Sequence, residues 1–333
     1  MPKLRTVRAA AVQLSPSFDS LEATFAKVLD AMKEAAEHKA DLVVFPEAIL
    51  PYYPYFAYLT APADGAEAHL RLYDQAVLLP GHLTDTIGAL ASELNLVTAI
   101  GITERDHAAL YSTQLIFDAD GALALRRRKT ITTKHEQLVW TQGDANGLKV
   151  VESCVGRVGS LACWEHFNPL ARYALMAQHE HIHCAHFPGG RLAPIGAGQM
   201  EASICNHALE SGCFVVCASG WLSPEQLDRL SPPGNLAQKP MAGGSMTAII
   251  GPDGRHLADP LTSGEGLVVA DLALAEILER KRLVDNVRHP DLSLQIRDRT
   301  AAAATATSTP PATIGRSAPE PLSSLDFELA DLL

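Results

Sequence analysis

Apolar residues in the first part of the chain alternate between short continuous runs and a stretch with helical spacing. The apolar run at residues 6–14 predicts a buried strand, the spacing at 21–38 predicts a helix, and the run at 41–45 predicts a second strand. A strand, a helix and a strand in succession are typical of proteins in which helices cover a largely parallel sheet. We therefore predict that the chain opens with a strand–helix–strand unit.

The same pattern continues to about residue 283. Helices are predicted at residues 83–94, 169–179 and 274–283. Strands are predicted at residues 97–103, 111–117, 159–162, 182–187, 214–219, 245–250 and 266–271. Strands interspersed with helices indicate the α/β fold class.

The order of these elements also bears on domain organisation. No linker interrupts the first 300 positions, so we predict one large domain over residues 1–299. From about Thr300 the composition shifts to Ala, Thr, Ser and Pro, which cannot bury enough apolar surface to offset the entropy of ordering. Residues 300–333 are predicted to form a disordered tail, whose last residues, 325–333, either stay in solvent or dock on a partner subunit.

Composition and charge narrow the possible partners. Hydrophobic residues make up 47% of the chain, enough for a large core, and the net charge of −11 would repel nucleic acid. The apolar stretch at residues 9–12 is too short for a signal peptide, and no stretch is long enough to span a membrane. We expect a cytoplasmic protein with neither membrane nor nucleic-acid partners. Its six cysteines are then expected to be free thiols, mostly buried and inert.

One cysteine differs from the others in its surroundings. Cys163 follows the predicted strand at 159–162, and Glu47 and Lys129 likewise end apolar runs. Ligands of α/β sheets bind at such carboxyl ends. A thiol with a pKa of about 8.5 needs a base to become a nucleophile, and Glu47 can be that base. Lys129 and the N–H of Trp164 can stabilise the negative charge that forms during attack.

With these residues the chain resembles the nitrilase superfamily over roughly residues 5–295. The Glu-Lys-Cys triad of that family corresponds to Glu47 in Phe-Pro-Glu, Lys129 in Arg-Arg-Lys and Cys163 in Cys-Trp-Glu. Glu136, in Lys-His-Glu, matches a second glutamate that the family often adds to the triad. The Cys-Trp-Glu run, followed by Pro-Leu at 169–170, looks like the true nitrilase branch, and within it like bacterial enzymes that prefer aliphatic nitriles and dinitriles.

The resemblance implies a reaction. A nitrile and water would give a carboxylic acid and ammonia through a thioimidate and then a thioester on Cys163. Glu47 would act as the base, Lys129 would hold the developing charge, and Glu136 would orient Lys129 or the substrate. No cofactor or metal is implied. An amidase or a cyanide-degrading enzyme could use the same triad, and both remain alternatives.

The resemblance also implies a fold, an assembly and a pocket. The family fold is a four-layer αββα sandwich, and its members form homodimers or longer spiral homo-oligomers. Because small-molecule sites are lined mainly by apolar and aromatic groups, we expect Tyr53, Trp164 and Phe187 to bind the substrate.

The segment 179–186, which reads His-Glu-His-Ile-His-Cys-Ala-His, suggests a metal site instead. On a strand, however, His181 and His183 would share one face while Cys184 and His186 point to the other. One zinc ion could not easily collect all four side chains. We predict no metal here and expect hydrogen-bonded histidines close to the site, with a non-catalytic metal-binding module as the rival hypothesis.

Overall fold

The structure is a computed structural model that describes residues 5–190, 196–230, 244–287 and 295–299. Up to Asn286 the chain forms one unit around a twelve-stranded sheet, in which neighbouring strands follow the order β6-β5-β4-β2-β1-β10-β9-β8-β7. Three further strands pair with this path, β3 with β4, β11 with β10 and β12 with β1. From Val287 on, the description covers that residue and a helical segment at 295–299.

The strands differ widely in length. They are β1 (Thr6–Leu14), β2 (Leu42–Val44), β3 (Val77–Leu78), β4 (Val97–Asp106), β5 (Ala109–Phe117), β6 (Leu123–Arg128), β7 (Val151–Ser153), β8 (Gly156–Ala162), β9 (Ile182–Phe187), β10 (Phe214–Gly220), β11 (Ala248–Ile250) and β12 (Gly266–Ala273).

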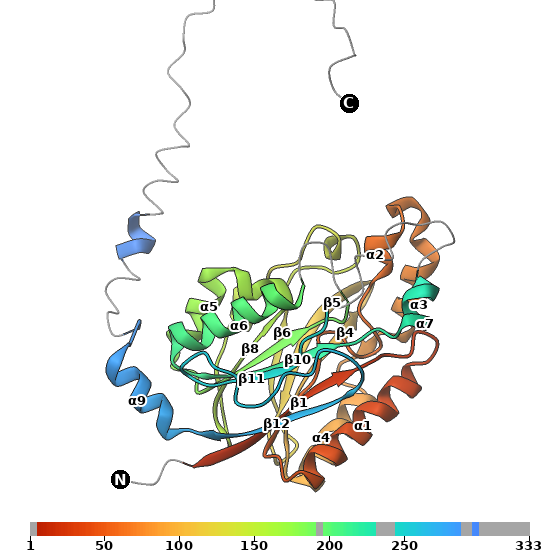
Figure 1. Ribbon diagram of the computed structural model, residues 1–333. Coiled ribbons are helices and arrows are strands. Elements are labelled where there is room, and N and C mark those ends of the chain that lie inside the picture. Colours follow the sequence, from red (N-terminus) through yellow and green to blue (C-terminus); the bar gives the residue numbers. More distant parts are fainter. Residues whose placement is uncertain (1–4, 191–195, 231–243, 288–294, 300–333) are drawn as a thin grey trace, which may run out of the picture. The chain divides into compact units, whose positions relative to one another are not determined.

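Helices follow many of these strands (Figure 1). The α-helices are α1 (Leu21–Glu37), α2 (Phe56–Leu59), α3 (Ala66–Gln75), α4 (His82–Leu94), α5 (Pro169–Met176), α6 (Ala197–Ser211), α7 (Pro224–Leu230) and α9 (Ala275–Leu283). Single 3-10 turns are η1 (Pro62–Asp64), η2 (Glu136–Leu138), η3 (Ala145–Gly147) and η4 (Cys163–Phe167).

The sheet folds into two facing layers where β1 meets β10. These strands pair only at their carboxyl ends, through Gln13 with Ser219 and Leu14 with Gly220. One layer therefore contains β6, β5, β4, β2, β1 and β12, and the other contains β7, β8, β9, β10 and β11. Strands β2, β6 and β8 run in the same direction. β2 is parallel to β4, and β6 is too, because the antiparallel strand β5 lies between β4 and β6. β8 is connected to β2 through the parallel pairs of β9, β10 and β1.

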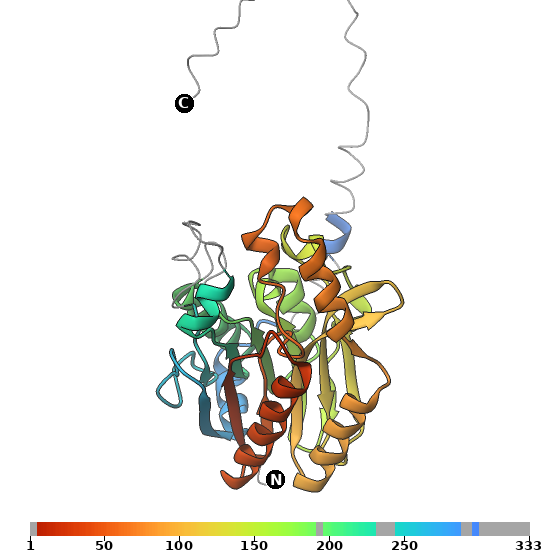
Figure 2. The same cartoon turned by 90° about the vertical axis from the view of Figure 1, so that its right-hand side faces the viewer.

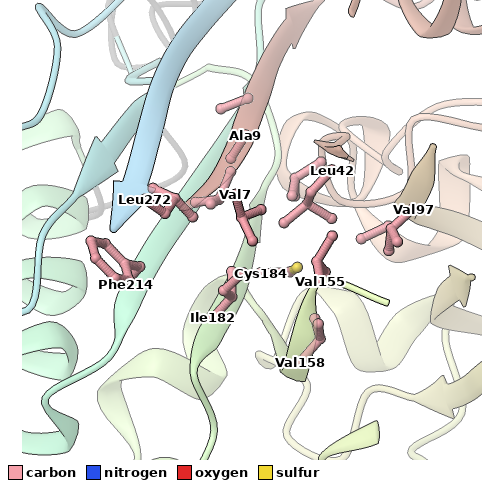
Figure 3. Close-up of a cluster of buried hydrophobic side chains, with 14 of the residues drawn as sticks. Val7, Ala9, Leu42, Val97, Val155, Val158, Ile182, Cys184, Phe214 and Leu272 are labelled. Carbon is pink, nitrogen blue, oxygen red and sulfur yellow. The ribbon is translucent and has the colours of Figure 1, made fainter. Parts of the chain in front are cut away.

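Alternation along the strands decides which side chains lie between the layers. On β1, Val7 and Ala9 join an inner cluster with Phe214 of the facing layer (Figure 3). The alternate residues Ala10 and Val12 face outward and belong to a different cluster. The outward residues of β1, β2 and β4 pack under α1 and α4, and those of β9 and β10 pack under α6. The view in Figure 2 is from the side of α1 and α4. The four layers, helix, sheet, sheet and helix, confirm the predicted αββα sandwich.

Sequence patterns predicted most of these elements. The strands expected at 6–14 and 182–187 coincide with β1 and β9. Seven elements were missed, namely α2, α3, α6, α7, β3, β6 and β7, and for α6 and β6 the reason is clear from the sequence. The buried face of α6 includes Ser203, His207 and Ser211, so its apolar spacing is broken. Strand β6 ends in three arginines and therefore does not read as a buried strand.

Two other expectations concern cysteines and the chain end. Cys154 is exposed, so the expectation that it is buried was wrong; the turn from β7 to β8 carries it to the surface. The predicted tail at 300–333 lies outside the described residues and stays a prediction. Among the described helices, none has the length and apolar character required to cross a membrane.

Two leucine substitutions test the layered core. Leu42 is fully buried between the layers, whereas Leu70 on α3 is 61% exposed. We expect Leu42→Ala to lower the free energy of unfolding by about 2–5 kcal/mol, because it removes buried apolar surface and leaves a cavity. Leu70→Ala, the same chemical change in solvent, should alter it by about 0.5 kcal/mol or less. Urea unfolding followed by circular dichroism measures both, and equal losses would contradict the assigned layers.

Candidate active site

Glu47, Lys129 and Cys163 lie at one end of the two layers. Each directly follows a strand or the short extension of one: Glu47 follows β2, Lys129 follows β6, and Cys163 follows β8. Because these strands run in the same direction, their carboxyl ends lie at the same edge. The fold thus collects a carboxylate, an amine and a thiol from distant parts of the chain, as the strand-end pattern predicted.

A tight turn presents Glu47. Ala48, the next residue, has a φ of 46°, in the left-handed region. The turn lies directly against Gly101 of β4, where a Cβ would come within 2.6 Å of the Pro46 oxygen. From the facing layer, the carbonyl of Phe187 accepts the backbone N–H of Glu47 at 3.3 Å. Both layers therefore hold this carboxylate in place.

Cys163 also occupies a sharp turn, with a φ of 43°. A non-glycine residue in the left-handed region carries backbone strain, and such strain is common at functional sites. The backbone N–H of Trp164 lies near the thiol and counteracts the effect of burial on the pKa of Cys163. The strand therefore ends abruptly at a buried thiol beside a backbone N–H.

A buried ion pair connects this turn to β6. The guanidinium of Arg127 donates two hydrogen bonds to Glu165, at 2.7 and 2.8 Å, and both side chains are completely buried. Glu165 also accepts the backbone N–H groups of Ala162 at 2.9 Å and of Thr130 at 2.7 Å. These two N–H groups flank the reactive residues Cys163 and Lys129. Glu165 therefore fixes the ends of β6 and β8 relative to each other.

Lys129 lies between two carboxylates. Its Nζ donates to Oε1 of Glu47 and to Oε1 of Glu136, each at 2.8 Å, and all three side chains are buried. Ser112 donates a hydrogen bond to Glu47 at 2.9 Å, and the Tyr53 hydroxyl donates one to Glu136 at 2.6 Å. The second oxygen of Glu47, Oε2, is buried and has no hydrogen-bond partner among the residues that the structure describes. One carboxylate oxygen thus remains available to take a proton.

Burial and neighbouring charges shift the pKa values of this group. Burial raises the pKa of Glu47 to about 7, although Lys129 opposes the shift. Burial also raises the pKa of the Cys163 thiol well above its usual value, again against Lys129. For Lys129, burial favours the neutral amine, but the two carboxylates outweigh it and keep the pKa well above its ordinary value. The site therefore holds a protonated thiol, a carboxyl group whose pKa is about 7, and a fixed cation.

The aromatic residues expected to bind substrate occupy different environments. Tyr53 is almost fully buried and bonded to Glu136, while the Trp164 ring is 38% exposed and packs against Phe167 at 5.1 Å. Phe187 is fully buried, with its ring stacked on His166 at 4.9 Å. These positions adjoin the reactive groups, and the expected substrate contacts stay predictions.

A second buried polar cluster lies beneath Cys163. His183 Nδ1 contacts Glu180 at 3.0 Å, and His207 Nε2 contacts the other oxygen of Glu180 at 2.6 Å. His166 contacts His183 at 3.0 Å through the two Nε2 atoms, and its Nδ1 contacts the Cys163 carbonyl at 2.9 Å. Sequence reasoning noticed His183 but missed its partners. His166, three residues after Cys163, was the signal in the sequence that could have pointed to this cluster.

Three residues of this cluster have side chains of the kind that bind a metal ion, and two of them belong to the segment 179–186 for which a metal site was the rival hypothesis. Ligand atoms of Glu180, His183 and His207 lie within 4.8 Å of one another. The individual contacts have hydrogen-bond lengths, and all three side chains are fully buried. His181 lies elsewhere, where it accepts the backbone N–H of Arg157. These contacts are those of hydrogen-bonded side chains, and the absence of a metal stays a prediction.

Known proteins resemble this chain over most of its length. The model of the carbon–nitrogen hydrolase family matches residues 8–282. A nitrilase of Paraburkholderia phymatum is 52% identical over 90% of this chain and 89% of that protein, and an aliphatic nitrilase of Rhodococcus rhodochrous is 36% identical over 88% and 83%. A carbon–nitrogen hydrolase from Helicobacter pylori G27 has the same fold, with a TM-score of 0.69 at 21% identity over 86% of this chain and 95% of that one.

Removing Arg127 tests the buried ion pair. Arg127→Met leaves the Glu165 carboxylate buried without a cation, so we expect the free energy of unfolding to fall by about 3–5 kcal/mol at neutral pH. Burial disfavours the Glu165 carboxylate, but Arg127 outweighs it, and the pKa lies below the ordinary 4.5. The stabilisation is therefore complete at neutral pH and lost as the pH falls through that lowered pKa. Urea unfolding at neutral and acidic pH should show the difference between the two proteins narrowing in acid.

Arg126→Met is the matched control. Arg126 is partly exposed and shares Glu104 with Arg128, which keeps that carboxylate paired after the substitution. We expect a loss of about 1 kcal/mol or less. A loss as large as that of Arg127→Met would show that the buried pair has no special role.

Proposed function

The chain belongs to the carbon–nitrogen hydrolase family, and we propose that it hydrolyses nitriles to carboxylic acids and ammonia with Cys163 as the nucleophile. The observation that carries the proposal is the buried Lys129, which is bonded to Glu47 and Glu136 and close enough to Cys163 for its charge to oppose the rise that burial causes in the pKa of the thiol. The relative named nitrilase, at 52% identity over 90% of this chain, supports nitriles as the substrate class.

In the first step the thiol adds to the nitrile. Glu47 takes the proton of Cys163 on its free oxygen, and the sulfur attacks the nitrile carbon. Negative charge develops on the nitrile nitrogen, where Lys129 stabilises it. Glu47 then returns the proton to that nitrogen, so the product is a neutral thioimidate on Cys163.

Two water molecules complete the reaction. Glu47 accepts a proton from the first water as its oxygen adds to the thioimidate carbon, and passes this proton to the nitrogen, which gives a tetrahedral intermediate with an NH2 and an OH group. Glu47 then moves the hydroxyl proton to the NH2 group, and the C–N bond breaks to release ammonia as the thioester carbonyl forms. The remaining thioester is attacked by the second water, which releases the carboxylic acid and restores the thiol. The sum is one nitrile and two waters converted into one acid and one ammonia. Glu136 holds Lys129 in place through these steps.

Within nitriles, we propose aliphatic nitriles and dinitriles as the preferred substrates. The support is the similarity to the aliphatic nitrilase of Rhodococcus rhodochrous. Ammonia release from aliphatic, aromatic and dinitrile substrates, from the corresponding amides and from cyanide separates this preference from the two alternatives. Faster release from amides than from nitriles would favour an amidase.

We also propose that the chain assembles with copies of itself. Leu170 on α5 is 74% exposed and Leu278 on α9 is 61% exposed. Burial of these apolar side chains against another copy would be favourable. The one-domain organisation over residues 1–299, with a tail at 300–333, remains part of this proposal. Size-exclusion chromatography with light scattering measures the assembly.

Replacing the nucleophile is the first test of the reaction. Cys163→Ala should reduce ammonia release from a nitrile at least about 1,000-fold, because no other group in the site can form the thioimidate. Cys205→Ala, which alters a half-exposed thiol on α6, should leave the rate unchanged. Folding of both variants is checked by circular dichroism. Substantial turnover by folded Cys163→Ala would exclude the proposed mechanism.

The pH dependence tests Glu47 as the base. Because the Glu47 pKa is about 7, kcat/KM should rise with pH through about 7 as the carboxylate forms. Ser112 donates a hydrogen bond to that carboxylate and so lowers its pKa. Ser112→Ala should therefore move the rise to higher pH by roughly 1 unit or less. A rise that stays in place or moves to lower pH would contradict this assignment.

A further inference from the structure

The buried cluster of His166, Glu180, His183 and His207 beneath Cys163 contains a carboxylate whose ion-pair partners are histidines. Glu180 is 1% exposed, and its ion-pair partners within the described residues are His183 and His207, with no lysine or arginine among them. An isolated buried charge is costly unless a proton or a counter-ion neutralises it. The strand beside it makes room for this carboxylate, because a Cβ at Gly159 would lie 2.1 Å from Glu180 Oε2.

Counting hydrogens along the cluster shows how the charge is neutralised. The Cys163 carbonyl only accepts, so His166 Nδ1 carries a hydrogen. One of the two Nε2 atoms in the contact between His166 and His183 must carry another. The contact between His183 and Glu180 requires a third, on either partner. Two neutral imidazoles supply only two, so the geometry contains one additional proton.

The additional proton leaves the cluster without net charge. Burial lowers the pKa of His183 to about 4 and that of His166 well below its ordinary value, so neither ring would hold a proton in isolation. The three contacts together nevertheless require it, and the same proton neutralises the carboxylate of Glu180. The neutral alternative would place two lone pairs 3.0 Å apart beside an unneutralised buried carboxylate, which costs more than protonation of the cluster.

The chain of contacts ends on the peptide that presents the thiol. The carbonyl of Cys163 and the N–H of Trp164 belong to one peptide unit, and that N–H lies near the thiol, where it counteracts the rise in the pKa of Cys163. A donor on the carbonyl polarises the peptide and makes its N–H a stronger donor toward the thiol. It also holds the peptide in the strained orientation that a φ of 43° at Cys163 imposes.

We propose that His166 is a positioning residue for Cys163, and that Glu180 and His183 keep its Nδ1–H directed at the Cys163 carbonyl. This inference rests on the proposed function in taking Cys163 as the nucleophile. His166 touches neither substrate nor sulfur. It acts through the peptide that carries the Trp164 N–H to the thiol.

Two substitutions at His166 separate positioning from packing. Asparagine places an amide N–H where Nδ1 lies and keeps the bond to the Cys163 carbonyl, but it is smaller than histidine. Phenylalanine keeps an aromatic ring to stack on Phe187 but has no donor. If His166 positions the peptide, His166→Asn is the more active variant. If His166 only fills space, His166→Phe is the more active one, and the proposal is wrong.

The reactivity of Cys163 can be measured without nitrile turnover. Iodoacetamide labelling of Cys163, followed by mass spectrometry of its peptide, reports the reactivity of the thiol directly. We expect His166→Phe to slow labelling and kcat about 10- to 100-fold with KM changed less than about 3-fold, and His166→Asn to recover most of the loss. His181→Asn and His181→Phe, which alter a histidine bonded to Arg157 instead, should leave labelling unchanged.

A second pair of variants covers the case in which His166→Phe does not fold. In Glu180→Gln the amide can donate to His183 and accept from His207, so every contact persists with neutral rings. Glu180→Leu removes both contacts. Faster labelling of Cys163 in Glu180→Gln than in Glu180→Leu supports the proposal, and equal labelling contradicts it.

Metal content provides the remaining outcome. Stoichiometric zinc in the purified protein that is lost in His183→Ala would overturn the proposal, because an ion would then occupy the place of the proton. If no nitrile releases ammonia but labelling follows the predicted order, the proposed function fails and the positioning role stands. If nitriles are hydrolysed but the order is reversed, only the positioning role fails.

Discussion

The site depends on the buried ion pair between Arg127 and Glu165. Arg127 is on β6 in one layer, and Glu165 follows β8 in the other, so this contact joins the two layers at the end where their strands finish. Glu165 also accepts the N–H groups of Ala162 and Thr130, the residues beside the thiol and the amine. Because a buried charge must be paired, the ends of both strands are held in one arrangement.

The same requirement for charge balance explains the state of the reactive groups. With Glu47 and Glu136 both ionised, Lys129 balances only one of the two buried carboxylates. Burial raises the pKa of Glu47 to about 7, and the neighbouring carboxylate of Glu136 adds to this rise while Lys129 opposes it. A base of that strength can take a proton from a thiol and return it within one reaction cycle at neutral pH.

Sequence reasoning predicted the fold and the reactive residues for a specific physical reason. Strands such as β1 carry continuous apolar runs, and the groups that end such runs must lie at the edge of the sheet. Glu47 and Cys163 were recognisable in this way. His207 was not recognisable. It lies on the buried face of α6, where polar residues interrupt the helical pattern, and its partner Glu180 belongs to a different part of the chain, just before β9. Contacts between elements far apart in sequence leave no local pattern to read.

The four residues from Cys163 to His166 illustrate the difference between a motif and its physical content. The sequence marks the run as typical of nitrilases, with the tryptophan and glutamate as the distinguishing letters. In the structure, the N–H of Trp164 lies near the thiol, and Glu165 ties the turn to β6. His166 contacts the carbonyl of the same peptide from below. All three contacts bear on how the thiol is presented, and none of them involves the partly exposed ring of Trp164, which we expect to contact the substrate.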